Sequence, residues 1–488
     1  MSSTTKTRKW YQIRWFQEYD TPEERKLIIK LDLLIVPYVF LAYWVKYIDQ
    51  ANINNAYVAG LSDDLGFHGN QLVRLQTLYT LGAVLGQLPF MYLFTKIPMF
   101  YLIPFLDVAW GIFTLLQFRV HSFAELAAYR FLVGWFEAAF FPAVHYIFGS
   151  WYRGDEIARR GGFFYVGLTL GTLTAALIQS GASARLDGVH GLAGWRWMYI
   201  ICSIITIPVG LLGLVVLPGT PDRPNRLVIK EHDLNIAKNR LRRAGHALEG
   251  KVTFSTFGKI AKNPRIWSLL LLDVFFWNAC LNSSSGGFLL WVKSLKRYTP
   301  AHINELGAIP PALGIFYVLA VCFSSDLILG PAWAITVAHV WNAIGLIILT
   351  IWDVPENAKW FAFMTTYASV AMSSVLYGWI NSQLKYSPAE RSVVLVLTNT
   401  VAQSTTAWTP LLVFKTVEAP RFRKGYPFVL GNAICLILFA HFVKYNIDKR
   451  GSKQATVSDS ESGSASVNEV SVENPGDKAV PVSALPAQ

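Results

Sequence analysis

The chain has 488 residues, of which 53% are hydrophobic and only 15% are charged, against about 25% charged residues in ordinary soluble domains. Its net charge of +12 comes from basic residues dispersed over polar segments, with no stripe of interleaved aromatic residues on which nucleic-acid bases could stack. The composition excludes an ordinary soluble domain and argues against a nucleic-acid partner. We therefore predict a membrane protein whose surroundings are the lipid bilayer.

Apolar stretches long enough to cross a bilayer recur along the chain. A helix needs about 20 predominantly apolar residues to span the hydrocarbon core, and we identify twelve such stretches. The sequence thus predicts an all-α membrane protein with twelve transmembrane helices, at 31–51, 72–94, 100–118, 126–150, 161–181, 195–217, 266–290, 305–322, 333–351, 360–384, 392–414 and 427–445.

A polar insert separates these spans into two sets of six. Such a layout is typical of two pseudo-repeats that rock around a site near the middle of the membrane. Residues 451–488 contain no aromatic residue and are rich in serine and acidic residues, so they cannot bury enough surface to fold. We predict an N-terminal tail, a six-helix bundle, a central loop, a second six-helix bundle and a disordered C-terminal tail, at 1–30, 31–217, 218–264, 265–445 and 446–488.

Basic residues gather in the two tails and in the central loop. Because short loops rich in Lys and Arg stay in the cytoplasm, we expect both termini there, in a monomeric multi-pass protein of the plasma membrane. Within the central loop, apolar residues recur near helical spacing. This pattern fits a short interfacial helix or a solvated basic linker, and the apolar residues concerned are Leu234, Ile236, Ala237 and Leu241.

The first span ends in YWVKYIDQANINNA and carries ionisable residues where a charge costs about 3 kcal/mol to insert. On a helix, Lys46 has Asp49 three positions and Gln50 four positions later, so the three side chains share one face. Lys46 and Asp49 could simply neutralise each other. Alternatively, they could hold an anionic substrate and a proton in adjacent places, and the insertion cost favours this second interpretation.

The fourth span, AAYRFLVGWFEAAFFPAVHYIF, places Arg130 and Glu137 two turns apart on one face. Gly134 lies between them and leaves room for a neighbouring helix or a solute. Pro142 interrupts the backbone hydrogen bonds, which is tolerated where a helix lines a cavity. His145 has a side chain suited to proton relay, although a single His near the end of a span is more often a packing residue.

The second half of the chain offers mainly neutral polar residues inside its spans. Such side chains can orient a substrate, but they also hold helices together, and both interpretations stay open. The candidates are Asn278, Asn282, Tyr377, Asn381, Asn399 and Gln403. We expect Asp273, near the inner end of the seventh span, to reach the lipid headgroups.

The sequence shows no pattern typical of an enzyme. There is no phosphate-binding loop of the GxxxxGK[ST] type, which argues against an ATP-driven pump, and the His and Cys residues lack metal-ligand spacing. We predict no enzyme, no metal and no cofactor. Energy would come from an ion gradient, or transport would be passive.

Several motifs together resemble the major facilitator superfamily over roughly residues 30–445. They are KYIDQANINNAYVAG, LGAVLGQLPF, YRFLVGWFEAAFFPA, WYRGDEIARR, GWRWMYI and LPGTPDRPN. Within that superfamily the chain resembles the anion:cation symporters of the allantoate permease type, and the wording of the first motif is most similar to fungal pantothenate transporters.

This resemblance implies a proton-coupled symporter that works by alternating access. Its substrate would be a small organic anion, with pantothenate as the first candidate. It implies that Asp49 and Glu137 carry the proton and that Arg130 binds the substrate carboxylate. The family often has Arg directly after the first-span acid, where this chain has Gln50, and Lys46 on the same face would replace the lost charge. Alternatives are a carrier of biotin or allantoate, a metabolite exporter or a non-transporting nutrient sensor.

Overall fold

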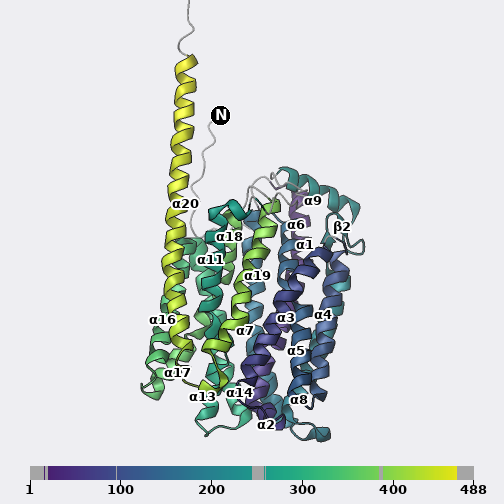
Figure 1. Cartoon of the computed structure of the whole chain (residues 1–488). Coiled ribbons are helices and arrows are strands. Elements are labelled where there is room, and N and C mark those ends of the chain that lie inside the picture. The colour runs from purple at the N-terminus through teal and green to yellow at the C-terminus, as the bar shows by residue number, and fades with distance from the viewer. Residues whose placement is uncertain are drawn as a thin grey trace, which may run out of the picture. The chain divides into compact units, whose positions relative to one another are not determined.

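The computed structural model describes residues 16, 20–94, 96–243, 258, 260–383 and 388–469. Helices account for most of the described chain (Figure 1). The α-helices before the central loop are α1 (Pro22–Ala56), α2 (Ser62–Asp64), α3 (Gln71–Phe94), α4 (Met99–Leu116), α5 (Phe123–Glu137), α6 (Phe140–Trp151), α7 (Gly154–Arg185) and α8 (Gly194–Val216). A two-stranded hairpin, β1 (Gly219–Thr220) and β2 (Arg223–Pro224), and helix α9 (Glu231–Arg243) belong to the central loop.

The α-helices after the central loop are α11 (Pro264–Ala279), α12 (Leu281–Ser284), α13 (Gly287–Ser294), α14 (Pro300–Gly307), α15 (Ile309–Ser324), α16 (Gly330–Ile351), α17 (Glu356–Met364), α18 (Ser373–Gln383), α19 (Pro388–Val413) and α20 (Gly425–Glu469). Short 3-10 or π turns join several of them, namely η1 (Tyr57–Leu61), η2 (Gln117–Arg119), η3 (Val189–Gly191), η4 (Ser325–Leu329), η5 (Thr366–Ala368) and η6 (Thr416–Glu418).

Ten helical stretches of the described chain are long and apolar enough to cross a membrane, and the predicted all-α membrane fold is confirmed. Two of the twelve predicted spans fall outside that set. The span predicted at 360–384 is broken into α17, η5 and α18, and the span predicted at 392–414 is the continuous helix α19, whose many Thr, Gln and Asn residues lower its hydropathy. The bundle boundaries at 31–217 and 265–445 stay a prediction.

Helix α1 starts sharply because its first turn is capped on both sides. The Thr21 hydroxyl accepts from the Glu24 backbone N–H at 3.3 Å, and the Thr21 backbone N–H donates to the Glu24 carboxylate at 2.9 Å. This capping box satisfies backbone donors that would otherwise lack partners at a helix N-terminus. Pro22 at the first helical position fixes the backbone angle further.

Helices α3 and α5 approach each other closely because glycines face backbone at their crossing. A Cβ atom on Gly134 of α5 would lie 2.1 Å from the carbonyl oxygen of Tyr79, and one on Gly82 of α3 would lie 2.2 Å from the carbonyl oxygen of Phe131. Only glycine fits at such distances. The contact sets Tyr79 directly beside the polar face of α5.

Helix α9 answers the question left open for the central loop: this part is a helix with a buried apolar face, made by Leu234, Ala237 and Leu241. Ion pairs fasten it to the start of α1 and of α7, between Lys30 and Asp233 at 2.8 Å, Arg243 and Glu24, and Arg240 and Glu156. We call this end of the helices, where α1 begins, the α9 side, and the opposite end the α2 side (Figure 1).

Asp233 also illustrates the electrostatics of this contact. Partial burial would raise the pKa of Asp233, but the hydrogen bond from the Lys30 ammonium and one from the Lys230 backbone N–H outweigh that effect, so the pKa is lowered. The carboxylate therefore keeps its charge near neutral pH, and the ion pair persists there.

At the C-terminal end, α20 continues to Glu469 through part of the segment predicted to be disordered, while residues 470–488 lie outside the described residues. The difference has a physical reason. Extending an existing helix avoids the costly nucleation step, and α20 is already formed by the apolar residues that precede the segment.

Candidate functional site

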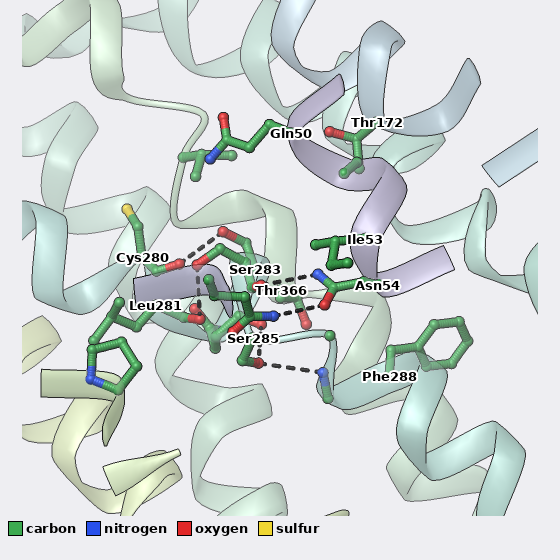
Figure 2. Close-up of a pocket in the computed structure, with 18 of the residues that line it drawn as sticks. Gln50, Ile53, Asn54, Thr172, Cys280, Leu281, Ser283, Ser285, Phe288 and Thr366 are labelled. Carbon is green, nitrogen blue, oxygen red and sulfur yellow. Dashed lines mark hydrogen bonds between the residues drawn. The ribbon is translucent and has the colours of Figure 1, made fainter. Parts of the chain in front are cut away.

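A cavity of about 220 Å³ lies among the helices and is lined by residues from both sets of predicted spans. One wall comes from α1, α3, α5 and α7, and the other from α11, α12, η5 and α19. Figure 2 shows Gln50, Ile53 and Asn54 of α1 on one side and Cys280, Leu281, Ser283 and Thr366 on the other. Its lining is mixed, with apolar rings and many small hydroxyl and amide groups, which suits a compact polar organic molecule.

Four of the residues singled out from the sequence line this cavity: Gln50, Arg130, Asn282 and Gln403. The structure therefore brings together residues from α1, α5, α12 and α19 that are far apart in the chain. Lys46, Asp49, Glu137, Asn278, Tyr377, Asn399 and His145 are not among its lining residues.

Arg130 is the cation of the cavity wall, and it forms no ion pair in the described structure, although Asp49 lies within electrostatic reach of its charge. Its guanidinium NH1 donates to the backbone carbonyl of Asp49 and to Oδ1 of Asn52, both at 3.1 Å. The guanidinium carbon lies 4.9 Å from the centre of the Tyr79 ring. In the described part of the chain Arg130 makes no ion pair, and its buried Nε has no hydrogen-bond partner.

Lys46 does not pair with Asp49, the neutralising partner considered from the sequence. Its ammonium lies 3.2 Å from Oε1 of Glu137, and the Tyr79 hydroxyl donates to the same oxygen at 2.5 Å. Glu137 is fully buried, and its Oε2 has no partner among the described residues. The three side chains belong to α1, α3 and α5, so the close approach of α3 and α5 assembles this cluster.

The side chain of Asp49 faces α4 and α8, does not line the cavity and is fully buried. Its Oδ2 accepts hydrogen bonds from Trp110 Nε1 at 3.1 Å and from the Thr206 hydroxyl at 3.2 Å. Both donors are neutral, and Oδ1 has no partner among the described residues. A buried carboxyl group with only neutral donors can hold a proton or release it as the charges around it change.

The amides of the second half divide into two groups. Asn282 and Gln403 face the cavity, where Asn282 donates to Asn342 at 3.0 Å and Gln403 accepts from Gln87 of α3 at 2.7 Å. Asn278 lies behind the wall and bridges α11 to α19 through Thr405 at 2.8 Å. For Asn278, the helix-holding interpretation fits the geometry.

Tyr377, Asn399 and Asp273 form a buried cluster. The Tyr377 hydroxyl lies 3.2 Å from Oδ2 of Asp273 and 3.1 Å from Oδ1 of Asn399. Asp273 is fully buried, so the expectation that it reaches the lipid headgroups is wrong. Depth along a span was a poor guide here, because α11 turns this residue toward α18 rather than toward lipid.

His145 packs among aromatic rings. Its Nδ1 lies 2.9 Å from the Phe141 carbonyl oxygen, and its ring centre is 4.2 Å from that of Phe141. No contact joins it to Glu137 or Asp49 in the described structure. The side chain of Asn381 lies outside the described residues.

Sequence reasoning missed the side chains that complete the site. Tyr79 holds Glu137, and Asn54 joins the two walls by donating to the Ser284 carbonyl oxygen at 3.2 Å while accepting from Gln76 at 2.6 Å. The only signal for Tyr79 was a glycine three residues later, which permits close packing but does not identify the partner helix.

Comparison with known proteins places the chain in a family. The profile described as Major Facilitator Superfamily matches residues 39–410. The chain is 38% identical over 432 residues to the vitamin H transporter of Saccharomyces cerevisiae, covering 86% of this chain and 72% of that protein. It is 31% identical over 404 residues to the pantothenate transporter liz1 of Schizosaccharomyces pombe, covering 82% of this chain and 78% of that protein.

Solved structures agree on the fold. The xylose transporter XylE from E. coli, in a partially occluded inward open conformation, superimposes with a TM-score of 0.62 at 13% identity, covering 84% of this chain and 98% of that protein. A fold of this kind, a family profile over most of the chain and relatives above 30% identity lead to one conclusion. The chain belongs to the Major Facilitator Superfamily, a family of multi-pass membrane transporters and not of enzymes.

Proposed function

We propose that this transporter is a proton-coupled symporter of a small carboxylate vitamin, working by alternating access around the cavity. The observation that carries the proposal is the unpaired guanidinium of Arg130 in the cavity wall beside the buried Lys46–Glu137 pair. An anion site and a protonatable acid thus lie two turns apart on α5, and Tyr79 contacts both.

Arg130 is the residue we assign to the substrate carboxylate. A buried cation that forms no direct ion pair is costly, and a carboxylate in the cavity would supply the missing partner. A guanidinium also offers a two-pronged set of donors that matches a carboxylate. Lys46 is already occupied by Glu137 in this structure, so we give it the supporting role.

Glu137 and Asp49 are the residues we assign to the proton. A proton on Glu137 would weaken its attraction to Lys46 and free that cation to favour the incoming anion. One anion and one proton would then enter together without a net change of charge in the buried site. This coupling accounts for why two acids and two cations are retained at a depth where each is costly.

Two substrates are candidates. The 38% identity to the vitamin H transporter favours biotin, and the 31% identity to a pantothenate transporter favours pantothenate, which is also the substrate that the sequence motifs imply. Both molecules have one carboxylate and uncharged polar groups. Gln50, Asn282 and Gln403 are the cavity residues we assign to those uncharged groups.

The proposal includes the orientation. With Lys- and Arg-rich segments inside the cell, the α9 side faces the cytoplasm and the α2 side faces outward. We place both termini in the cytoplasm and the protein, as a monomer, in the plasma membrane.

The test is uptake of labelled biotin and labelled pantothenate by yeast that lacks its own vitamin carriers. We expect accumulation that rises at low external pH, collapses with a protonophore and is blocked by the competing free acid. The alcohol analogues, which lack the carboxylate, should not compete. Equal competition by an alcohol analogue, or uptake that ignores both pH and protonophore, would reject the proposal.

A further inference from the structure

Asp273 is a buried acid that the proposed mechanism does not use. It lies on α11, is fully buried, and makes no ion pair in the described part of the chain. Its Oδ2 is 3.2 Å from the Tyr377 hydroxyl, and its Oδ1 has no hydrogen-bond partner among the described residues. Burying an isolated ionised carboxylate costs much free energy, so an acid at this position needs a physical explanation.

The hydrogen bonds around Tyr377 are complete in only one protonation state of Asp273. Trp277 Nε1 donates to the Tyr377 oxygen at 3.0 Å, and that hydroxyl lies within bonding distance of both Asp273 and Asn399. A hydroxyl has one proton to donate. With Asp273 protonated, Asp273 donates to Tyr377 and Tyr377 donates to Asn399. With Asp273 ionised, Tyr377 must turn to it, and Asn399 loses its donor.

The cluster touches the cavity at one end. Trp277 lies one helical turn from Asp273 on α11 and is a cavity-lining residue. Asp273 is therefore one turn closer than the cavity to the start of α11, the end that follows the central loop and belongs to the α9 side.

Residues from the first six predicted spans cover the cluster. The ring of Phe141 on α6 lies 5.3 Å from the ring of Tyr377. Tyr165 of α7 is buried, lies within electrostatic reach of Asp273, and its hydroxyl has no hydrogen-bond partner among the described residues. Besides Tyr377, Cys280 directly after α11 also interacts electrostatically with Asp273. No described cation faces it.

We propose that Asp273 is a second proton-binding site, located in the C-terminal half and reached from the α9 side. While Phe141 and Tyr165 cover it, the protonated carboxyl satisfies Tyr377 and Asn399. When the cavity opens toward the α9 side, these two residues withdraw, water reaches the carboxyl, and its proton leaves to that water. Closing again requires a proton to return. This inference rests on the proposed proton symport. It adds a site whose reprotonation limits how fast the cavity closes on the α9 side.

The experiment tests Asp273 in a variant from which the proton site at Glu137 has been removed. In the Glu137→Gln variant, exchange of labelled biotin, or of pantothenate if that is the vitamin accumulated, is measured in yeast with the cytosolic pH clamped and the external pH fixed. One pH unit changes the ratio of ionised to protonated carboxyl about tenfold. We expect exchange by Glu137→Gln to slow severalfold as cytosolic pH rises, and exchange by Glu137→Gln with Asp273→Asn to lose most of that response.

Asp107→Asn is the matched control. Asp107 is also a buried acid bonded to a tyrosine, Tyr38, at 2.8 Å, but both residues belong to the first six predicted spans. Added to Glu137→Gln, it should leave the response to cytosolic pH in place. An equal response with and without Asp273→Asn, or the same loss with Asp107→Asn, would overturn the inference.

The outcome separates the two proposals. If uptake by the native protein depends on pH but Asp273→Asn has no effect, only the proposed proton site at Asp273 is rejected. Native uptake that ignores pH would reject the symport and the Asp273 site with it. If Glu137→Gln does not exchange, the same comparison in the native background decides, where Asp273→Asn must weaken the response to cytosolic pH and Asp107→Asn must not.

Discussion

The ammonium of Lys46 and the carboxylate of Glu137 meet at 3.2 Å, and the same carboxylate oxygen accepts the Tyr79 hydroxyl at 2.5 Å. Lys46 retains 13% of its side-chain exposure, whereas Glu137 has none. Attraction inside a low-dielectric site is strong, and it vanishes when a proton neutralises the acid. The pair thus links the charge of α5 to the position of a cation on α1.

Glu137→Gln should destabilise the protein and should also uncouple substrate transport from the proton gradient. Removing one partner of a buried ion pair costs about 3–5 kcal/mol, whereas replacing both partners by neutral groups is often tolerated. We expect a lower Tm for the single variant and recovery of Tm in Lys46→Met with Glu137→Gln. Neither variant should accumulate substrate against a gradient, although exchange persists in part. A single variant as stable as the native protein would contradict the pair.

Asp49→Asn should keep the fold and lose the coupling. The amide oxygen can accept the same hydrogen bonds from Trp110 and Thr206, so the stability change should stay below about 1 kcal/mol. Accumulation driven by external acid should disappear while exchange continues. Full pH-dependent uptake by both Asp49→Asn and Glu137→Gln would remove these two acids from the proton pathway.

Arg130→Lys should weaken substrate binding although the charge is kept. A lysine cannot reproduce the two-pronged geometry of a guanidinium on a carboxylate, and we expect a loss of about tenfold or more in affinity, or at least about 1.4 kcal/mol. Competition binding with the labelled vitamin measures it.

A matched control for that variant is Arg196→Lys. Arg196 also donates to backbone carbonyl oxygens, those of Phe118 and Val120, but it lies outside the cavity lining. Its replacement should leave affinity unchanged. Normal binding by Arg130→Lys would move the carboxylate contact elsewhere, with Lys46 as the first candidate.

Gly134→Ala should separate α3 from α5. The added Cβ would lie 2.1 Å from the Tyr79 carbonyl oxygen, and overpacking of this kind costs about 1–3 kcal/mol. Gly181→Ala on α7 is the control, because a Cβ there meets no atom within 4 Å and alanine favours a helix interior by about 1 kcal/mol. Thermal unfolding should show opposite shifts of Tm, and equal shifts would disprove the close contact.

Much of the fold could be predicted because the length and composition of an apolar stretch identify a membrane span. The broken span of α17, η5 and α18 could not, since its average hydropathy hides the break. Arg130 lines the cavity, and its predicted contact with the substrate carboxylate stays a prediction.

The pairings were harder to predict. Helical spacing placed Lys46 beside Asp49, but spacing along one helix says nothing of a neighbouring helix, and α5 supplies the nearer acid. Asp273 was misjudged for the same reason. Its partner Tyr377 is distant in sequence, and only packing of α11 against its neighbours shows that the carboxyl points inward.

The glycine contact between α3 and α5 has a consequence for leakage. Because no side chains separate the two backbones at this crossing, we expect α3 and α5 to move as one rigid unit. That unit carries Tyr79, Arg130 and Glu137. In the proposed mechanism, the substrate anion and the proton on Glu137 both bind to this unit. The two binding sites would therefore change their exposure to the two sides of the membrane together, which limits leakage of either the proton or the anion alone.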